Sequence, residues 1–275
     1  INASEGATVS LEETGETIVN GETSLDLTKG VKLIVTAQNS NRAHWVLYAD
    51  NNGYTSAYGL GKILTDSKSN NAEREVYLEQ HNSTTFPNSN CAPTCAAMAI
   101  NWANPRAQMT VEMARSFNKD IELWTDDIIV QCLASYGTTH AVHDLDLISW
   151  SLEVEEITRG YGELVKKLID EGKIIIMSMR MQDITYIHDQ SVPVPHTNTY
   201  YKGAEGNHAI IIKGYRIVDG ITWAEVYDPW RQGYTYSDGT YKGKDRYYTI
   251  SDLALSIKGR YLGSVITVTS KTVTN

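Results

Sequence analysis

The sequence predicts an α+β protein in which a small all-β module precedes a larger domain. Residues 7–66 contain short β-type runs without helical periodicity, residues 91–171 contain helical patterns, and residues 173–269 return to β-rich runs. Helices and strands that are segregated along the chain are typical of proteins in which helices pack on an antiparallel sheet. We therefore expect the larger domain to have a helical half packed on such a sheet.

The N-terminal module is predicted over residues 1–70. Gly and Asn separate its β-type runs, and residues 38–41 (QNSN) have the composition of a hairpin turn. The polar segment 66–74 (DSKSNNAER) has the composition of a linker. We expect an accessory or binding role for this module. Its predicted strands are Thr17–Val19, Val31–Ala37 and His44–Tyr48.

The larger domain is predicted over residues 75–270. Glu75–Glu79 alternates enough to form a strand, and a helical half follows it. Thr110 is suited to cap one helix and Gly172 to stop another. The predicted helices are one that begins at Cys91, one from Thr110 to Phe117, one from Thr125 or Asp126 to Gly137, and Tyr161–Glu171.

The second half of this domain is predicted to supply the sheet. Its first two runs are nearly continuous in Ile, as expected of strands covered on both faces. A short helix, Ser251–Ile257, separates the last two runs. The predicted strands are Lys173–Ser178, His208–Tyr215, Thr222–Tyr227, Arg246–Ile250 and Tyr261–Thr269.

Composition and charge exclude several classes of partner. The net charge is -9 and there is no run of Lys or Arg, which argues against nucleic acid and against an anionic membrane surface. No apolar run approaches the roughly 20 residues of a membrane helix, so we expect no membrane insertion. The sequence leaves the oligomeric state open.

Cysteine usage and the first residue bear on the compartment. Three cysteines are too few for a disulfide scaffold, and an odd number leaves at least one thiol free. The chain begins at Ile1 rather than Met, as a mature exported protein does after its signal peptide is removed. We expect a secreted or cell-surface bacterial protein.

Cys91 is the candidate nucleophile, in the segment NCAPTCAAMAINW. Pro93 suits the first turn of a helix, so Cys91 is expected at a helix N-terminus. The unpaired N–H groups and the dipole there stabilise a thiolate, which is the nucleophilic form of cysteine.

Three further residues have the chemistry that such a nucleophile requires. His208 begins one predicted strand and Asp228 ends the next, so an antiparallel pairing would place the carboxylate beside the imidazole that it orients. Gln80 precedes Cys91 by a short Asn- and Pro-containing loop and is a candidate oxyanion donor, together with the backbone N–H of Cys91.

These motifs resemble the papain-like cysteine peptidases that process bacteriocin leaders, in particular their stand-alone, C39-like relatives. The similar elements are Gln80, the segment CAPTCAAM from Cys91, GNHAIIIKGY around His208 and YDPW around Asp228. The resemblance implies a papain-like fold and a cysteine peptidase that hydrolyses a peptide or protein amide bond. It further implies that Cys91 is the nucleophile, His208 the base, Asp228 its orienting partner and Gln80 the oxyanion donor.

Two departures from the family pattern concern the surroundings of the site. Ala92 follows the nucleophile where the leader peptidases often have Gly, and residues 181–207 form a long loop before the base. A loop of this length is typical of a lid or a binding element. We expect Tyr186, Tyr200 and Tyr201 of this loop to line the substrate groove. We expect Trp230 to contact substrate and to shield the catalytic hydrogen bond from water.

Other interpretations stay open at the level of sequence. Cys95 is a core residue in our interpretation but a minority candidate for the nucleophile, and Cys132 lies in an apolar run. His140 and His143 invite a zinc hypothesis, but a spacing of three on a strand or loop points them apart, so we expect no metal and no cofactor. The same triad would also suit a non-hydrolytic acyl transferase or a cell-wall amidase, and a catalytically silent binding or adhesion module is the third hypothesis.

Overall fold

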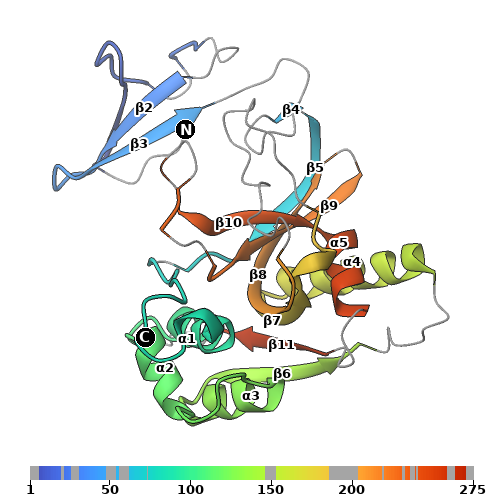
Figure 1. Ribbon diagram of the computed structural model, residues 1–275. Helices are drawn as coiled ribbons and strands as arrows, with labels where there is room; N and C mark the ends of the chain where they lie inside the picture. Colours follow the sequence, from blue (N-terminus) through green and yellow to red (C-terminus); the bar gives the residue numbers. More distant parts are fainter. Residues whose placement is uncertain are drawn as a thin grey trace. The chain divides into compact units, whose positions relative to one another are not determined.

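The computed structural model divides the chain into two compact units, residues 1–64 and 65–275 (Figure 1). The structure describes residues 6–19, 22–25, 31–47, 54–55, 62–72, 74–145, 153–185, 204–218, 220–230, 233–235, 239, 241–258 and 264–270.

The first unit is built on a three-stranded antiparallel sheet of β1 (Thr8–Leu11), β2 (Val31–Thr36) and β3 (Arg42–Leu47), in that order. The predicted hairpin between β2 and β3 is confirmed, since the N–H of Ala37 donates to the carbonyl of Asn41 at 2.8 Å. The prediction of a strand at Thr17–Val19 was wrong, because Thr17 makes only an isolated bridge to Ser10 of β1, and the sequence analysis missed β1 itself.

The boundary between the units lies inside a strand. β5 (Lys62–Ser69) pairs with the short β4 (Tyr54–Thr55) near its start and with β8 (Asn207–Val218) of the second unit. The interpretation of residues 66–74 as a linker was therefore wrong for Asp66–Ser69. These residues are strand, and the N–H of Asn70 still donates to the carbonyl of Lys213 on β8 at 2.8 Å.

The helices of the second unit lie close to the predicted positions, except that the helix predicted at Tyr161–Glu171 begins seven residues earlier, at Val154. The hydroxyl of Thr110 accepts from the N–H of Met113 at 3.1 Å and so caps α2, and Gly172 adopts a left-handed φ of 76° after α4. The described residues of this unit also contain the short 3-10 helices η1 (Pro87–Ser89) and η3 (Met181–Asp183). The helices are α1 (Cys91–Ala103), α2 (Val111–Phe117), α3 (Asp126–Ser135), α4 (Val154–Asp170) and α5 (Ile250–Lys258).

The strands of this unit form one antiparallel sheet in the order β10-β9-β8-β7-β11-β6, with β5 added beside the far half of β8. The prediction of a strand at Glu75–Glu79 was wrong, because the structure has no regular element there. The segment of His140 and His143, which the sequence left open as strand or loop, is a strand, β6. The ranges not yet given are β6 (Thr139–Asp144), β7 (Lys173–Arg180), β9 (Ile221–Tyr227), β10 (Lys242–Thr249) and β11 (Ser264–Thr269).

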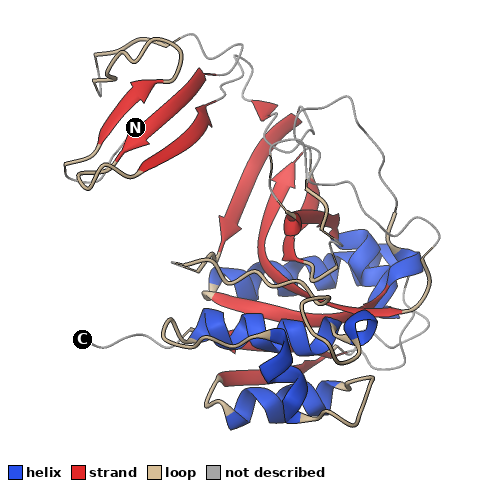
Figure 2. Cartoon of the chain, turned by 60° about the vertical axis from the view of Figure 1, so that its left-hand side comes forward, coloured by secondary structure: helices blue, strands red, loops and turns tan. Residues whose placement is uncertain are grey.

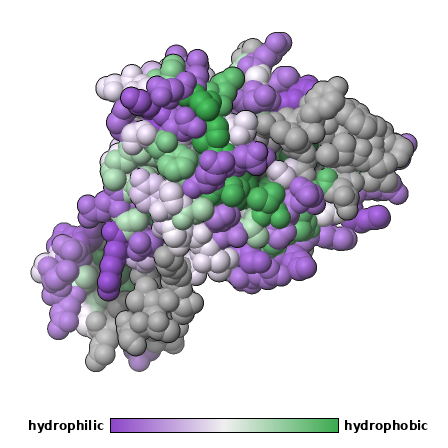
Figure 3. Space-filling model, turned by 90° about the horizontal axis from the view of Figure 1, so that it is seen from below, coloured by the Kyte–Doolittle hydropathy of each residue, from purple (hydrophilic) through white to green (hydrophobic). Residues whose placement is uncertain are grey.

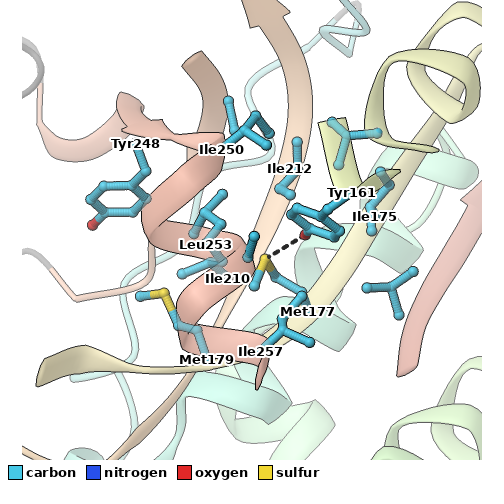
Figure 4. Packing of buried hydrophobic residues seen from close by; sticks show 14 of the residues in the cluster. Tyr161, Ile175, Met177, Met179, Ile210, Ile212, Tyr248, Ile250, Leu253 and Ile257 are labelled. Atoms are coloured by element: carbon cyan, nitrogen blue, oxygen red, sulfur yellow. Dashed lines mark hydrogen bonds between the residues drawn. The ribbon is translucent and has the colours of Figure 1, made fainter. Parts of the chain in front are cut away.

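Both faces of this sheet are covered by helices (Figure 2). Along β7, Ile174 and Ile176 pack in a cluster with residues of α1 and α3, whereas Ile175 and Met177 face a second cluster formed with α4 and α5. Figure 4 shows the second cluster, in which the hydroxyl of Tyr161 contacts the sulfur of Met177 at 3.1 Å. The apolar runs in β7 and β8 are thus explained by burial on both sides.

The α+β class and the papain-like arrangement of a helical half on an antiparallel sheet are confirmed. Polar and apolar residues are interspersed on the surface seen in Figure 3. Among the described helices, none combines the length and the apolar character that crossing a bilayer requires.

Candidate active site

Cys91 is the first residue of α1, a helix whose other residues are all buried. Its thiol is free, and the side chain is partly accessible. The backbone N–H groups in the first turn of a helix have no acceptor within that helix. The fold therefore places the thiol at a buried helix end, where the N–H of Ala92 acts on the sulfur and the N–H of Thr94 donates to the carbonyl of Asn90 at 2.9 Å.

His208 is brought to the site by the start of β8, and Asp228 by the residue after β9. These strands are antiparallel neighbours, and Ile211 is opposite Tyr227. Nε2 of His208 lies 2.9 Å from Oδ1 of Asp228, and their side chains are only 2% and 0% exposed. The predicted proximity of the two residues is therefore present in the structure.

The thiol of Cys91 and the imidazole of His208 lie close enough for each to shift the pKa of the other. Since Nε2 of the imidazole is directed at Asp228, the remaining nitrogen, Nδ1, serves Cys91. Burial works to raise the pKa of Cys91, but the hydrogen bond and positive charge of His208, with the backbone N–H groups of Ala209 and Ala92, outweigh it and lower the pKa below its ordinary value.

The electrostatics of His208 complement those of Cys91. Burial works to lower the pKa of the imidazole, whereas the charge and hydrogen bond of Asp228 and the contact with Cys91 raise it to about 9. A lowered thiol pKa beside a raised imidazole pKa favours a thiolate–imidazolium pair. This pair is the activated form of a cysteine nucleophile.

Gln80 is fixed by backbone and side-chain contacts. Its N–H donates to the carbonyl of Pro229 at 3.0 Å, which joins the Gln80 segment to the turn after Asp228. Its Nε2 lies 3.3 Å from the carbonyl of Pro87 and 3.2 Å from that of Asn88. Two adjacent carbonyls at these long distances can share one amide hydrogen, which leaves the second hydrogen for another acceptor.

Trp230 covers the imidazole edge. Its ring meets the ring of His208 at a centroid distance of 6.1 Å and an interplanar angle of 84°, and that of His81 at 5.5 Å and 81°. Its backbone N–H donates to Oδ1 of Asp228 at 2.8 Å. This position suits the expected shielding role. Tyr186, Tyr200 and Tyr201 lie outside the described residues.

The comparison with protein families decides the class of protein. A profile of the Peptidase_C39 like family matches residues 74–255. The chain belongs to this family. Membership implies a cysteine peptidase that acts on peptides, and it confirms the resemblance that the sequence motifs predicted.

A crystal structure of a provisionally assigned C39-like peptidase from Bacillus anthracis is also similar to this chain. The identity is 10%, the TM-score is 0.38, and the match covers 76% of this chain and 100% of the other. Neither fold nor function is inferred from this likeness, because the score and the identity are low. No curated protein matches the chain.

The C39-like domain contains a second cysteine near the site. Cys95 lies one turn into α1 and is fully buried, and burial raises its pKa well above the ordinary value. Burial likewise raises the pKa of Cys132 to about 12. Both environments disfavour a thiolate, so they argue for Cys91 over Cys95 as the nucleophile.

The zinc hypothesis finds no support in the domain. His140 and His143 lie on β6, where a spacing of three places them on opposite faces. Nδ1 of His140 contacts the carbonyl of Thr138 at 2.8 Å, and Nε2 of His143 contacts the hydroxyl of Thr267 at 2.9 Å. Within the described ranges, no three His, Cys, Asp or Glu side chains are placed to hold a metal ion.

Several residues that position the C39-like site were not predicted from the sequence. Arg246 and Tyr248 of β10 reach Oδ2 of Asp228. Arg115 of α2 is fully buried and its Nε donates to Oδ1 of Asn90, the residue before Cys91, at 2.6 Å. A strand spacing of two predicts that Arg246 and Tyr248 share a face, but it does not show what that face meets.

Proposed function

We propose that this chain is a cysteine peptidase that hydrolyses a peptide or protein amide bond. The observation that carries the proposal is the 2.9 Å contact of His208 with Asp228, together with the thiol of Cys91, whose pKa the same imidazole lowers. A nucleophile, a base and a residue that orients the base are the parts that covalent amide hydrolysis requires.

In the proposed mechanism the thiolate of Cys91 attacks the amide carbonyl carbon. The oxyanion accepts hydrogen bonds from the backbone N–H of Cys91 and from Nε2 of Gln80. The imidazolium of His208 then gives its proton to the leaving amine as the C–N bond breaks, which leaves a thioester on Cys91. Water attacks the thioester after His208 takes its proton, and the carboxylic acid leaves as the Cys91 thiolate and the imidazolium are restored.

Asp228 and Trp230 support these steps in the proposal. The carboxylate of Asp228 keeps Nε2 of His208 protonated and turned inward, so that Nδ1 exchanges the proton with sulfur and substrate. The ring of Trp230 limits the access of water to this hydrogen bond and forms part of the substrate surface. We also retain the expectation of a secreted or cell-surface location, which fractionation of the producing cells tests.

Digestion of a denatured proteome, followed by mass spectrometry of the new termini, tests the proposal on many peptide bonds at once. Wild-type protein is expected to produce new termini with a shared sequence preference, and Cys91→Ala to lower their formation by about a thousandfold or more. Cys95→Ala, one turn further along α1, is the matched control and is expected to keep the activity.

The same digestion, with an added amine or with peptidoglycan as the substrate, distinguishes the peptidase from the acyl transferase, the cell-wall amidase and the silent binding module. With an added primary amine, new termini that carry the amine instead of a free carboxylate would indicate acyl transfer. Release of products from peptidoglycan without cleavage of any protein would indicate a cell-wall amidase. Undiminished cleavage by Cys91→Ala would overturn the proposal, and an inert wild-type protein would favour a silent binding module.

A further inference from the structure

Asp228 accepts hydrogen bonds at both oxygens of its carboxylate, and the two oxygens serve different neighbours. Oδ1 accepts from His208, at 2.9 Å from Nε2, and from the N–H of Trp230. Oδ2 lies 3.0 Å from Nη1 of Arg246 and 2.6 Å from the hydroxyl of Tyr248. One oxygen is thus directed at the imidazole, while the other is held by the next strand.

Arg246 and Tyr248 are placed for this contact by β10. They are two residues apart, so they share one face of the strand, and they are opposite Val226 and Ala224 of β9. Asp228 follows β9 directly. Nη1 of Arg246 also lies 2.9 Å from the hydroxyl of Tyr248, and both side chains are buried.

We propose that Arg246 and Tyr248 are positioning residues that hold Asp228 ionised while His208 gives up its proton. This inference rests on the function proposed above. Neither residue is accessible to substrate, because Arg246 is 0% and Tyr248 2% exposed, so both act through Asp228.

The charges of the site explain why such residues are needed. In the resting state the thiolate of Cys91, the imidazolium of His208, the carboxylate of Asp228 and the guanidinium of Arg246 alternate in sign and sum to zero. In the thioester intermediate Cys91 and His208 are both neutral. The buried carboxylate would then lack its imidazolium partner, and the guanidinium of Arg246 still neutralises it.

The hydroxyl of Tyr248 keeps its proton over the pH range in which His208 titrates. Burial raises the pKa of its phenol well above the ordinary value, so the hydroxyl remains protonated and continues to donate to Oδ2. Its hydrogen bond and the ion pair from Arg246 together fix the plane of the carboxylate.

Several other titratable groups surround this carboxylate. The charges of Cys91 and Asp228 act on Cys95, that of Arg246 acts on Lys242 of β10, and the ring of His81 packs against that of Trp230. The hydroxyl of Tyr77 donates to the backbone carbonyl of Asp228 at 2.8 Å. The charged and titratable groups around the site include Cys91 and Cys95 from α1, Arg115 from α2, His208 from β8, Lys242, Arg246 and Tyr248 from β10, and Tyr77, Glu79 and His81 from the segment before α1.

The rate at which iodoacetate alkylates Cys91, measured against pH by mass spectrometry, tests this inference without a known substrate. The anionic reagent is attracted by the imidazolium, so its rate falls as His208 loses its proton. This fall at high pH is the upper limb of the pH profile. In wild type its midpoint is expected near the His208 pKa of about 9.

Arg246→Met removes a positive charge near the imidazolium, which raises the proton affinity of His208. The upper limb is therefore expected to move upward by about one pH unit, a tenfold change in that affinity. Arg246→Lys keeps the charge and is expected to restore most of the wild-type profile. Tyr248→Phe removes a donor without changing the charge and is expected to shift the limb upward by less.

Tyr247→Phe is the matched control. Tyr247 lies between the two residues on β10, and its hydroxyl accepts from Nε of Arg216 at 3.0 Å instead of contacting Asp228. We expect this variant to leave the limb unchanged. A purely structural role for Arg246 would lower the amount of folded protein, read by near-UV circular dichroism, without moving the limb of the folded fraction.

The outcomes distinguish the proposed peptidase function from the proposed role of Arg246 and Tyr248. If wild-type Cys91 is not alkylated rapidly below its ordinary pKa, the proposed function fails. If wild type behaves as expected but Arg246→Met leaves the limb in place or moves it downward, only the positioning role is overturned. Should Arg246→Met fail to fold, an upward shift in Tyr248→Phe supports the inference, and an unmoved limb in that variant overturns it.

Discussion

Nε2 of His208 lies 2.9 Å from Oδ1 of Asp228, and both side chains are buried. This contact forms at the point where β8 begins and β9 ends, so the sheet itself fixes the distance between the two residues. It also raises the pKa of His208, against the opposing effect of burial, to about 9.

Asp228→Asn is expected to lower the pKa of His208 from about 9 toward or below the ordinary imidazole value, since burial then acts without the opposing carboxylate. An imidazole that is neutral at pH 7 cannot protonate the leaving amine. The upper limb of the iodoacetate profile should therefore move downward, and peptidase activity at neutral pH should fall by about a hundredfold. An upper limb that stays near the wild-type value would contradict this electrostatic role.

Gln80→Ala is expected to lower kcat by about 100-fold to 1,000-fold with little change in KM, because the lost amide serves the oxyanion and not the bound substrate. Gln80→Glu also loses the donor but buries a carboxylate against the carbonyls of Pro87 and Asn88, so it should in addition destabilise the domain. The backbone contact from Gln80 to Pro229 does not depend on the side chain, so Gln80→Ala should remain folded. Steady-state kinetics on the best peptide from the proteome digest measure the effect, and a change confined to KM would refute the oxyanion role.

Arg115→Met is expected to destabilise the domain by about 3 kcal/mol, because it removes charged hydrogen bonds that join three segments. The guanidinium donates to the side chain of Asn90 and to the carbonyls of Ser89, Ile121 and Glu122. Denaturant unfolding measures the free energy.

The exposed Arg106 is the matched control for this variant. Arg106→Met is expected to change the free energy of unfolding by less than about 0.5 kcal/mol. Equal effects of the two substitutions would contradict the structural role of Arg115.

Gly243 of β10 accepts a hydrogen bond from the N–H of Asp228 at 2.7 Å. Gly243→Ala is expected to disrupt this backbone contact and to displace Asp228. A Cβ at Gly243 would come within 2.3 Å of the carbonyl oxygen of Asp228, and the φ of 118° is unfavourable for other residues. Activity and thermal stability should both fall. Gly160→Ala in α4 meets no atom within 4 Å and should stabilise by about 0.5–1 kcal/mol instead. Similar melting temperatures for the two variants would contradict the close approach.

Local signals were sufficient to predict much of the fold. Thr110 and Gly172 marked helix ends because capping and left-handed conformations depend on the residue itself. The proximity of His208 and Asp228 was predictable because adjacent antiparallel strands place the start of one beside the end of the other.

The errors arose where contacts distant in sequence decide the structure. The alternating segment Glu75–Glu79 forms no strand, and its Tyr77 instead donates to the carbonyl of Asp228. The strand β6 exists because it pairs with β11, where Thr139 is opposite Thr269. Arg246 likewise owes its buried position to Asp228 on the next strand, and no local pattern in β10 shows that partner.

The alkylation of Cys91 by neutral iodoacetamide, from about pH 5 to about pH 10, tests the central claim most directly. In wild type, Cys91 is expected to react well below its ordinary pKa and much faster than Cys95 and Cys132, whose pKa values are raised by burial. His208→Ala should remove this low-pH reactivity. If Cys91 instead titrates like an ordinary thiol, or reacts equally well without His208, the thiolate–imidazolium pair does not exist and the peptidase mechanism is wrong.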